Sequence, residues 1–291
     1  MLSVSLSRNM RKSLTDLIGS RFRNIQIVVC LPLSSQAGPV KKQSVEAQVN
    51  LPMIQKIEKI CRKYIDQLGE EEGKQYNIQN FLIMYILGST SNTEYRTKLF
   101  DRWPTYLEDF QACKSILGYR YPETLCEQFF RLNLKRNSKI LDVACGPGNV
   151  ALILREEGYT HVDGLDPSSG LLAAGEQKGL FNKTFCCFVT PDSKTPIPDN
   201  AYDVLLCSAG MFPGSIVPQA FPELLRITRP GGIIAWNIAD GYEGFNEFFK
   251  DYDKIYNQLI QDGSWVEVEP VQRMEEMLMG DAGFTYIMKK I

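Results

Sequence analysis

Two acidic residues and two glycines in the middle of the chain have the types and spacing needed to hold a ligand. Asp142 lies near the end of an apolar run, residues 139–144, and Gly146 and Gly148 follow it in a turn. Glycine carries no Cβ, so the backbone can turn sharply there and come close to a ligand. A carboxylate within an apolar segment is costly to bury unless it is paired or hydrogen-bonded. Asp142 must therefore meet either a cationic or hydroxyl-bearing ligand or nearby backbone N–H groups.

The second acid, Asp166, ends another short apolar segment, residues 161–166. Carboxylate oxygens can accept the hydrogens of both hydroxyls of a ribose, and the spacing from the glycine turn favours that function. Alternatively, Asp166 caps the helix predicted after Pro167 and Ser168. The two functions are compatible.

The glycine turn is compatible with more than one kind of nucleotide. Gly146, Gly148 and Ala151 fit the G-x-G-x-x-A pattern of dinucleotide-binding turns. However, Asp142 would place negative charge near a pyrophosphate, and Pro147 removes an N–H that phosphate oxygens would need. A cationic or zwitterionic nucleoside fits better, and S-adenosylmethionine is such a molecule.

Short apolar segments alternate with helical ones from about residue 95 to the end of the chain. Strands are predicted at residues 139–144, 161–165, 185–189, 203–208, 232–238 and 284–288. Helices are predicted at residues 105–117, 122–132, 149–157, 169–176, 218–227 and 244–261. This alternation predicts an α/β fold with a parallel sheet that helices cover on both faces.

The overall composition excludes several classes of function. The chain has 291 residues with 32 basic and 34 acidic side chains, so it has no general positive charge that would favour nucleic acid. No apolar run reaches the roughly 18 residues of a membrane span. The single histidine, His161, leaves little material for a histidine triad or a metal site. The eight cysteines lack metal-ligand spacing, and we expect free thiols.

The first 94 residues differ from the rest. Residues 1–45 are rich in arginine, lysine and serine and hold one acid, Asp16, which is typical of a mitochondrial transit segment or a disordered extension. Residues 46–94 are predicted to form a helical region, and residues 95–291 form the main domain. The expected compartment is the cytoplasm, with the mitochondrion as the alternative.

Four segments together resemble the motifs of class I S-adenosylmethionine-dependent methyltransferases, in the order and spacing typical of that family. They are DVACGPG at 142–148, GLDPS at 164–168, IPDNAYDVL at 197–205 and LRITRPGG at 225–232. Two upstream segments, FDRWPTY at 100–106 and YRYP at 119–122, are similar to the Williams–Beuren-region methyltransferase-like family.

The resemblance implies a fold and a set of cofactor contacts. The fold would be a Rossmann-like, doubly wound sheet of seven mostly parallel strands with an antiparallel last strand. Asp166 would hold the ribose, Asp192 the adenine amino group, and Ser208 would line the methyl-transfer position. Trp103 and Tyr106 would cover the cofactor, unless they pack a helix on the sheet. The residues implied to bind S-adenosylmethionine are Asp142, Ala144, Cys145, Gly146, Gly148, Asp166, Pro167, Asp192 and Ser208.

The expected reaction is methyl transfer to an oxygen, nitrogen or sulfur atom, with catalysis mainly by proximity, orientation and removal of water. No catalytic acid or base is identifiable. The segment SAGMFP at 208–213 lacks the Asn-Pro-Pro-Tyr motif of nucleic-acid base methylation, which favours a small-molecule acceptor. The alternatives are a non-catalytic interaction protein and a nicotinamide-dependent oxidoreductase. The late aromatic residues, from Tyr242 to Tyr256, line a substrate pocket or pack a helix on the core.

Overall fold

The computed structural model describes residues 118–212, 214–240, 246–278 and 281–291, and it describes Lys59, Thr97, Asp101, Gln111, Lys114 and Ser115 individually. The chain divides into two units, residues 1–83 and 84–291, and all the structure discussed below belongs to the second. The predictions for residues 1–45, for residues 46–94 apart from Lys59, and for Trp103 and Tyr106 lie outside the described residues.

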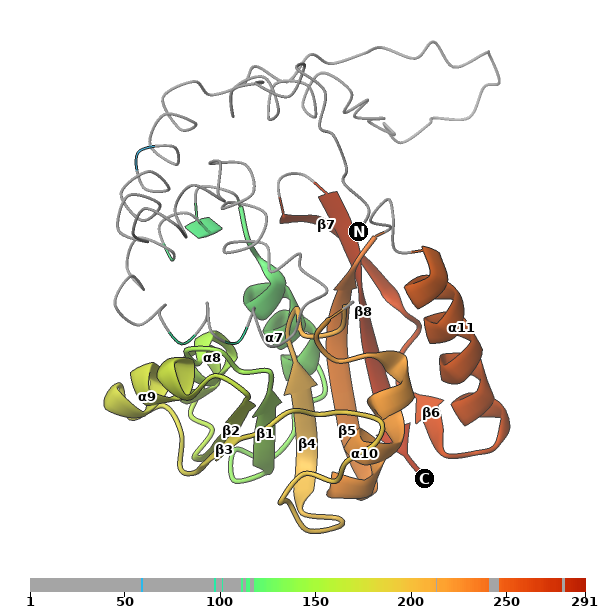
Figure 1. The fold of residues 1–291 in the computed structure, drawn as a ribbon, viewed down its shortest axis with the longest axis horizontal. Coiled ribbons are helices and arrows are strands. Elements are labelled where there is room, and N and C mark those ends of the chain that lie inside the picture. The colour runs from blue at the N-terminus through green and yellow to red at the C-terminus, as the bar shows by residue number, and fades with distance from the viewer. Residues whose placement is uncertain are drawn as a thin grey trace, which may run out of the picture. The chain divides into compact units, whose positions relative to one another are not determined.

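A mixed sheet forms the centre of the domain (Figure 1). Its strands are β1 (Lys139–Val143), β2 (His161–Asp166), β3 (Thr184–Cys186), β4 (Tyr202–Cys207), β5 (Thr228–Ala239), β6 (Trp265–Glu267), β7 (Gln272–Leu278) and β8 (Asp281–Lys290). The order is β3-β2-β1-β4-β5-β8-β6, with β7 also paired to β8. β8 runs antiparallel to β5, β6 and β7, and the other pairs are parallel. The predicted Rossmann-like α/β fold with an antiparallel last strand is therefore confirmed.

The number of strands differs from the prediction at the edge of the sheet beyond β8. The described part of the sheet has eight strands rather than seven, because β6 and β7 together occupy the seventh position. β6 pairs with residues 288–290 of β8, and β7 pairs with residues 281–285. Pro270 lies between the two strands and has no N–H to donate, so the ladder is interrupted there.

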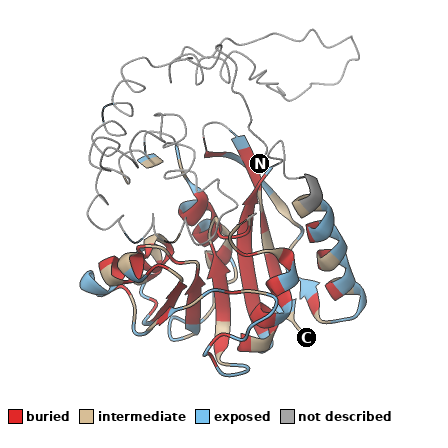
Figure 2. Cartoon of the chain, viewed as in Figure 1, coloured by how far each residue is buried: buried red, intermediate tan, exposed pale blue. Residues whose placement is uncertain are grey.

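Helices cover both faces of the sheet. Because side chains alternate along each strand, each strand contributes apolar side chains to the cluster on either face. The helices are α7 (Tyr121–Phe130), α8 (Asn149–Glu156), α9 (Ser169–Gln177), the short 3-10 helix η3 (Pro218–Ala220), α10 (Phe221–Ile227) and α11 (Asn246–Gln261). In β4, Val204 and Leu206 lie in one apolar cluster with α7 and α8. Leu205 and Cys207 lie in the other cluster, with α10 and α11. Figure 2 shows the central strands β1, β2, β4 and most of β5 as the buried layer.

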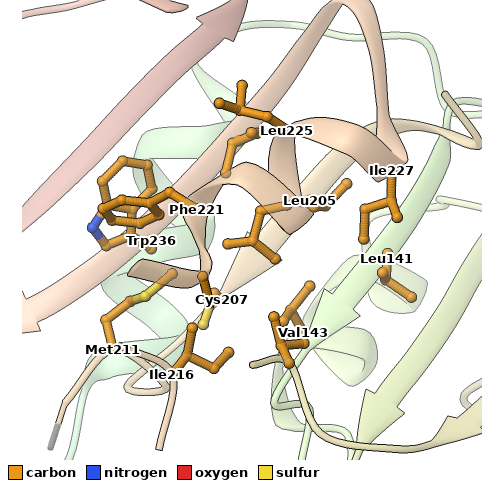
Figure 3. Close-up of a cluster of buried hydrophobic side chains, with 14 of the residues drawn as sticks. Leu141, Val143, Leu205, Cys207, Met211, Ile216, Phe221, Leu225, Ile227 and Trp236 are labelled. Carbon is orange, nitrogen blue, oxygen red and sulfur yellow. The ribbon is translucent and has the colours of Figure 1, made fainter. Parts of the chain in front are cut away.

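Several aromatic residues contact one another in the cluster on the α10 and α11 face. Phe221 lies 5.3 Å from Trp236 and 5.0 Å from Trp265 between ring centroids, and Figure 3 shows Phe221 and Trp236 beside Leu205 and Cys207. Tyr252 and Tyr256 are buried in the same cluster. The core-packing interpretation therefore holds for these two, whereas Tyr242 and Phe245 lie outside the described residues.

The turn predicted before the fifth strand is part of that strand. β5 begins at Thr228, and its register against β4 shifts between Tyr202 and Val204. Gly231 takes a φ of 73°, a conformation that favours glycine. Residues 228–232 thus form a bulge in the strand, where the sequence had indicated a turn.

Candidate functional site

The carboxyl ends of β1, β2 and β4 lie together, because the three strands are parallel neighbours with β1 in the middle. Asp142 of β1 is paired with Gly164 of β2 on one side and with Leu206 of β4 on the other. The Cys145 N–H donates to the Leu165 carbonyl at 3.1 Å, which continues the contact beyond the end of β1. The loops after these strands therefore share one edge of the sheet, where ligands of open α/β sheets bind.

The turn after β1 is built from residues with left-handed backbone conformations. Ala144, Gly146 and Gly148 have φ values of 53°, 54° and 87°, and Gly148 is the N-cap of α8. A Cβ on Gly148 would also lie 2.8 Å from Leu180 Cδ1, so no larger residue fits without movement. A Cβ on Gly146 would meet only Leu171 Cδ1 at 4.0 Å. The backbone at Gly146 is thus open to the approach of a ligand.

Asp142 is 1% exposed, and the described residues supply a hydrogen bond to only one of its two carboxylate oxygens. Its Oδ2 accepts a hydrogen bond from the Ala151 N–H at 3.2 Å, at the start of α8. Its Oδ1 is buried and has no hydrogen-bond partner among the described residues. Burial raises the pKa of this carboxyl well above its usual value, and the charge of Asp166 adds to the rise, while the Ala151 N–H opposes it. Among the described residues, backbone N–H groups therefore satisfy only one of the two oxygens of the Asp142 carboxylate.

Asp166 joins the turn after β1 to the loop after β2. Its Oδ2 accepts from the Gly146 N–H and its Oδ1 accepts from the Ser168 N–H, both at 2.9 Å. Each oxygen retains a second acceptor position, as a ribose diol would require. Burial and, to a smaller extent, the charge of Asp101 raise the pKa of Asp166 to about 6, while the two N–H donors oppose the rise. The N-cap of α9 is Ser168, whose Oγ accepts from the Leu171 N–H, so Asp166 is not the capping residue.

The loop after β4 packs directly on the turn after β1. A Cβ on Gly210 would lie 2.9 Å from the Cβ of Ala144 and 2.5 Å from Cys207 Sγ. The Ser208 Oγ is buried there and has no hydrogen-bond partner within the described part of the chain. Two unsatisfied polar atoms, Ser208 Oγ and Asp142 Oδ1, therefore belong to adjacent strand ends at this edge. Unpaired buried polar atoms are rare in proteins and need an explanation, which a polar ligand would supply.

Asn237 in β5 is a site-supporting residue that sequence reasoning missed. It is 0% exposed; its Oδ1 accepts from the Ala209 N–H at 2.9 Å, and its Nδ2 donates to the Tyr121 carbonyl at 2.6 Å. Ala209 has a φ of 51°, so this bond holds an unusual loop conformation next to Ser208. A polar residue in the apolar run IIAWNIA at 233–239 was the available signal, the same signal that identified Asp142.

The remaining predicted residues differ in burial and in their contacts with the site. Cys145 is buried, and burial raises the pKa of its thiol well above the usual value, so its side chain stays neutral. The Pro167 carbonyl accepts from Cys186 Sγ at 3.5 Å, beside Asp166. Asp192 is exposed, and within the described residues it makes no hydrogen bond or ion pair with the rest of the predicted set. Its contact with adenine stays a prediction.

A comparison with protein families places the same segments in a known domain. The family model described as "Methyltransferase domain" matches residues 140–232, which run from β1 to the bulge of β5. The chain carries a methyltransferase domain. It is of the S-adenosylmethionine-dependent class, and the buried acceptors of Asp142, Asp166 and Ser208 suit a ligand with hydroxyl and ammonium donors.

Several known proteins are similar to this methyltransferase. Methyltransferase-like protein 27 of Homo sapiens is 28% identical over 180 residues, which cover 60% of this chain and 71% of that protein. The demethylmenaquinone methyltransferase of Listeria welshimeri is 27% identical over 177 residues, covering 54% and 74% of the two chains. The crystal structure of a SAM-dependent methyltransferase from Aquifex aeolicus aligns with a TM-score of 0.44 and 18% identity, covering 65% of this chain and 98% of that one.

Three further features of the described residues concern ligands and partners. They contain no group of three or more His, Cys, Asp or Glu side chains arranged to hold a metal ion. None of the helices in this part of the chain has the length and apolar character needed to cross a membrane. The cysteines described, at positions 126, 145, 186, 187 and 207, are all free thiols.

The raised pKa of Asp166 predicts a pH-dependent stability. The pKa of Asp166 is about 6 in the folded protein and about 3.9 in the unfolded chain. Its contribution to the stability of the fold is therefore fully present below the unfolded pKa. This contribution is lost as the pH rises through about 6. Asp166→Asn has no such ionisation. The free energy of unfolding of the wild type, relative to Asp166→Asn, should therefore fall by about 2 to 3 kcal/mol between pH 4 and pH 7.

Urea titrations at several pH values measure this difference. Asp253→Asn, on the exposed part of α11, serves as the control and should follow the wild type at each pH. A difference between wild type and Asp166→Asn that does not change with pH would contradict the account of the buried carboxyl.

Proposed function

We propose that this methyltransferase transfers the methyl group of S-adenosylmethionine to an oxygen, nitrogen or sulfur atom of a small molecule. The observation that carries the proposal is the Asp166 carboxylate, which accepts from the Gly146 and Ser168 N–H groups and keeps further acceptor positions. A carboxylate held in this way at the end of the second strand is suited to the hydroxyls of a ribose.

Different residues around Asp166 are suited to bind different parts of the cofactor. Gly146 offers backbone that a ligand can approach, which suits the methionine end of the cofactor, whereas Gly148 lets the turn pack closely against Leu180. Asp142 Oδ1 and Ser208 Oγ are the polar atoms that a bound ligand would satisfy. When bound, S-adenosylmethionine supplies a methyl group activated by the positive sulfonium. The chain itself positions the reacting groups and excludes water, and no side chain is assigned the role of acid or base.

The loop after β4 supports an uncharged reacting end on the acceptor. Between Asp203 and Glu223 the sequence has no charged side chain. Met211 and Ile216 are buried, and the Ile216 N–H donates to the Gly210 carbonyl at 3.1 Å. A phosphate or carboxylate next to the methyl group would find no charged partner on this loop, so a neutral small molecule fits better.

The comparisons are consistent with this proposal. The likeness to Methyltransferase-like protein 27 supports the narrower resemblance to the Williams–Beuren-region group. The Listeria relative is named for demethylmenaquinone, which is a small molecule. A nicotinamide cofactor is less suitable. The Asp142 oxygen that has no partner among the described residues and the missing N–H of Pro147 are both unfavourable for a pyrophosphate.

Replacing the proposed ribose ligand should weaken cofactor binding. Asp166→Ala removes charge-assisted hydrogen bonds worth about 1.5 to 3 kcal/mol, so the Kd for S-adenosylmethionine should rise about 10- to 100-fold. Isothermal titration calorimetry of the folded variant measures the change, with Asp253→Ala as the control that should bind like the wild type. Unchanged affinity in Asp166→Ala would refute the ribose assignment, and wild-type binding of NAD without S-adenosylmethionine would refute the proposed cofactor.

Transfer to a small molecule can be tested without knowing the acceptor. The wild type, incubated with methyl-labelled S-adenosylmethionine and a metabolite extract, should place label in a neutral compound that an organic solvent extracts. Asp166→Ala at the same concentration should transfer less label, because less cofactor is bound. Cofactor binding without any labelled product would instead support the non-catalytic alternative, and label confined to protein or nucleic acid in a whole-cell extract would contradict a small-molecule acceptor.

A further inference from the structure

Asp101 lies far upstream of the glycine turn and yet contacts the loop that carries Asp166. Its Oδ1 accepts from Ser168 Oγ at 2.7 Å, across 67 positions of sequence, and from the Gly170 N–H at 3.2 Å. Both donors belong to the start of α9. Asp101 is exposed, and no sequence pattern had assigned it a role.

Ser168 connects Asp101 to the proposed ribose ligand. Ser168 is 0% exposed, and its N–H donates to Asp166 Oδ1 at 2.9 Å. Its hydroxyl donates to Asp101 and accepts from the Leu171 N–H, so Asp101 fixes the direction of that hydroxyl. The other Asp166 oxygen accepts from Gly146. One chain of hydrogen bonds therefore runs from Asp101 through Ser168 and Asp166 to the glycine turn.

The contact between Asp101 and α9 involves backbone as well as side chain. A Cβ added to Gly170 would lie 2.5 Å from the Asp101 carbonyl oxygen and 3.0 Å from its Cα. A second upstream residue contacts α8 through its side chain: Gln111 Nε2 donates to Asn149 Oδ1 at 2.8 Å. Residues 101 and 111 thus touch the first turns of the two helices that follow β1 and β2.

We propose that Asp101 is a positioning residue for cofactor binding, which holds the Asp166 carboxylate in place through Ser168. The inference rests on the proposed function, because it assumes that Asp166 binds the ribose. It adds a residue outside the matched domain, residues 140–232, to the machinery of that site. Asp101 acts as a hydrogen-bond acceptor, and its negative charge is a separate property.

The charge and the acceptor have opposite effects on Asp166, which allows them to be separated. The charge of Asp101 raises the pKa of Asp166 and so opposes its ionised, ribose-binding form. Among the described residues, the other ionisable groups coupled electrostatically to Asp166 are acids and thiols: Asp142, Cys145, Cys186 and Cys207. Asparagine at position 101 keeps an acceptor oxygen without the charge, whereas alanine removes both.

Two variants test the proposal by calorimetry with S-adenosylmethionine from pH 5 to pH 8. Asp101→Ala should raise the Kd about 5- to 10-fold at pH 7.5, the effect of losing one or two modest hydrogen bonds. Asp101→Asn should bind within about twofold of the wild type at pH 7.5, and its affinity should persist to lower pH, because Asp166 ionises more readily. Recovery of affinity in Asp101→Asn, which restores the acceptor without the charge, would distinguish the positioning role from an effect of charge.

The outcomes distinguish this inference from the proposed function. If Asp166→Ala weakens binding while Asp101→Ala binds like the wild type, the positioning role is wrong and the ribose assignment stands. If Asp166→Ala has no effect, the ribose assignment on which the inference rests fails, and the proposed function loses the observation that carries it. Equal losses in Asp101→Asn and Asp101→Ala at pH 7.5 would contradict a role as acceptor. Should Asp101→Ala not fold, Ser168→Ala replaces it, because this variant removes the hydroxyl through which Asp101 acts and keeps the N–H that donates to Asp166; wild-type affinity in Ser168→Ala would overturn the proposal.

Discussion

The site depends on one buried carboxylate, Asp166, whose two oxygens accept from the Gly146 and Ser168 N–H groups at 2.9 Å. Burying this group raises its pKa to about 6, so holding it ionised at neutral pH is costly to the fold. The two N–H groups offset part of that cost and tie the turn after β1 to the loop after β2. The arrangement makes sense if a ligand completes the hydrogen bonding of the carboxylate.

Polar residues within buried strands form the rest of the machinery. Asp142 in β1 and Asn237 in β5 are 1% and 0% exposed, and both bond to backbone N–H groups at the carboxyl edge of the sheet. Asn237 holds the loop after β4, and Asp142 holds the start of α8. Because the parallel strands bring these ends together, a few buried acceptors fix three loops around one position. The proposed methyl transfer then depends on positioning, with the chain supplying little charge near the acceptor.

The sequence predicted those features that depend on local pattern and left out those that depend on long-range contacts. The apolar run that contains Asp142 and the one that ends in Asp166 located β1, β2 and their turns, and the alternation of elements predicted the sheet. The split between β6 and β7 was missed, since those short strands exist only by pairing with β8. Asp101 was missed because its partners, Ser168 and Gly170, lie more than 60 positions away. Asn237 could have been found by the rule that identified Asp142.

A structure of the protein in complex with S-adenosylhomocysteine tests the central claim most directly. The account predicts that the ribose hydroxyls lie within hydrogen-bond distance, about 2.5 to 3.2 Å, of the Asp166 carboxylate oxygens. It also predicts that the sulfur faces the loop from Ser208 to Met211, with Asp142 Oδ1 bonded to the ligand or to a water that contacts it. A ligand bound elsewhere, or a ribose with no contact to Asp166, would contradict the account.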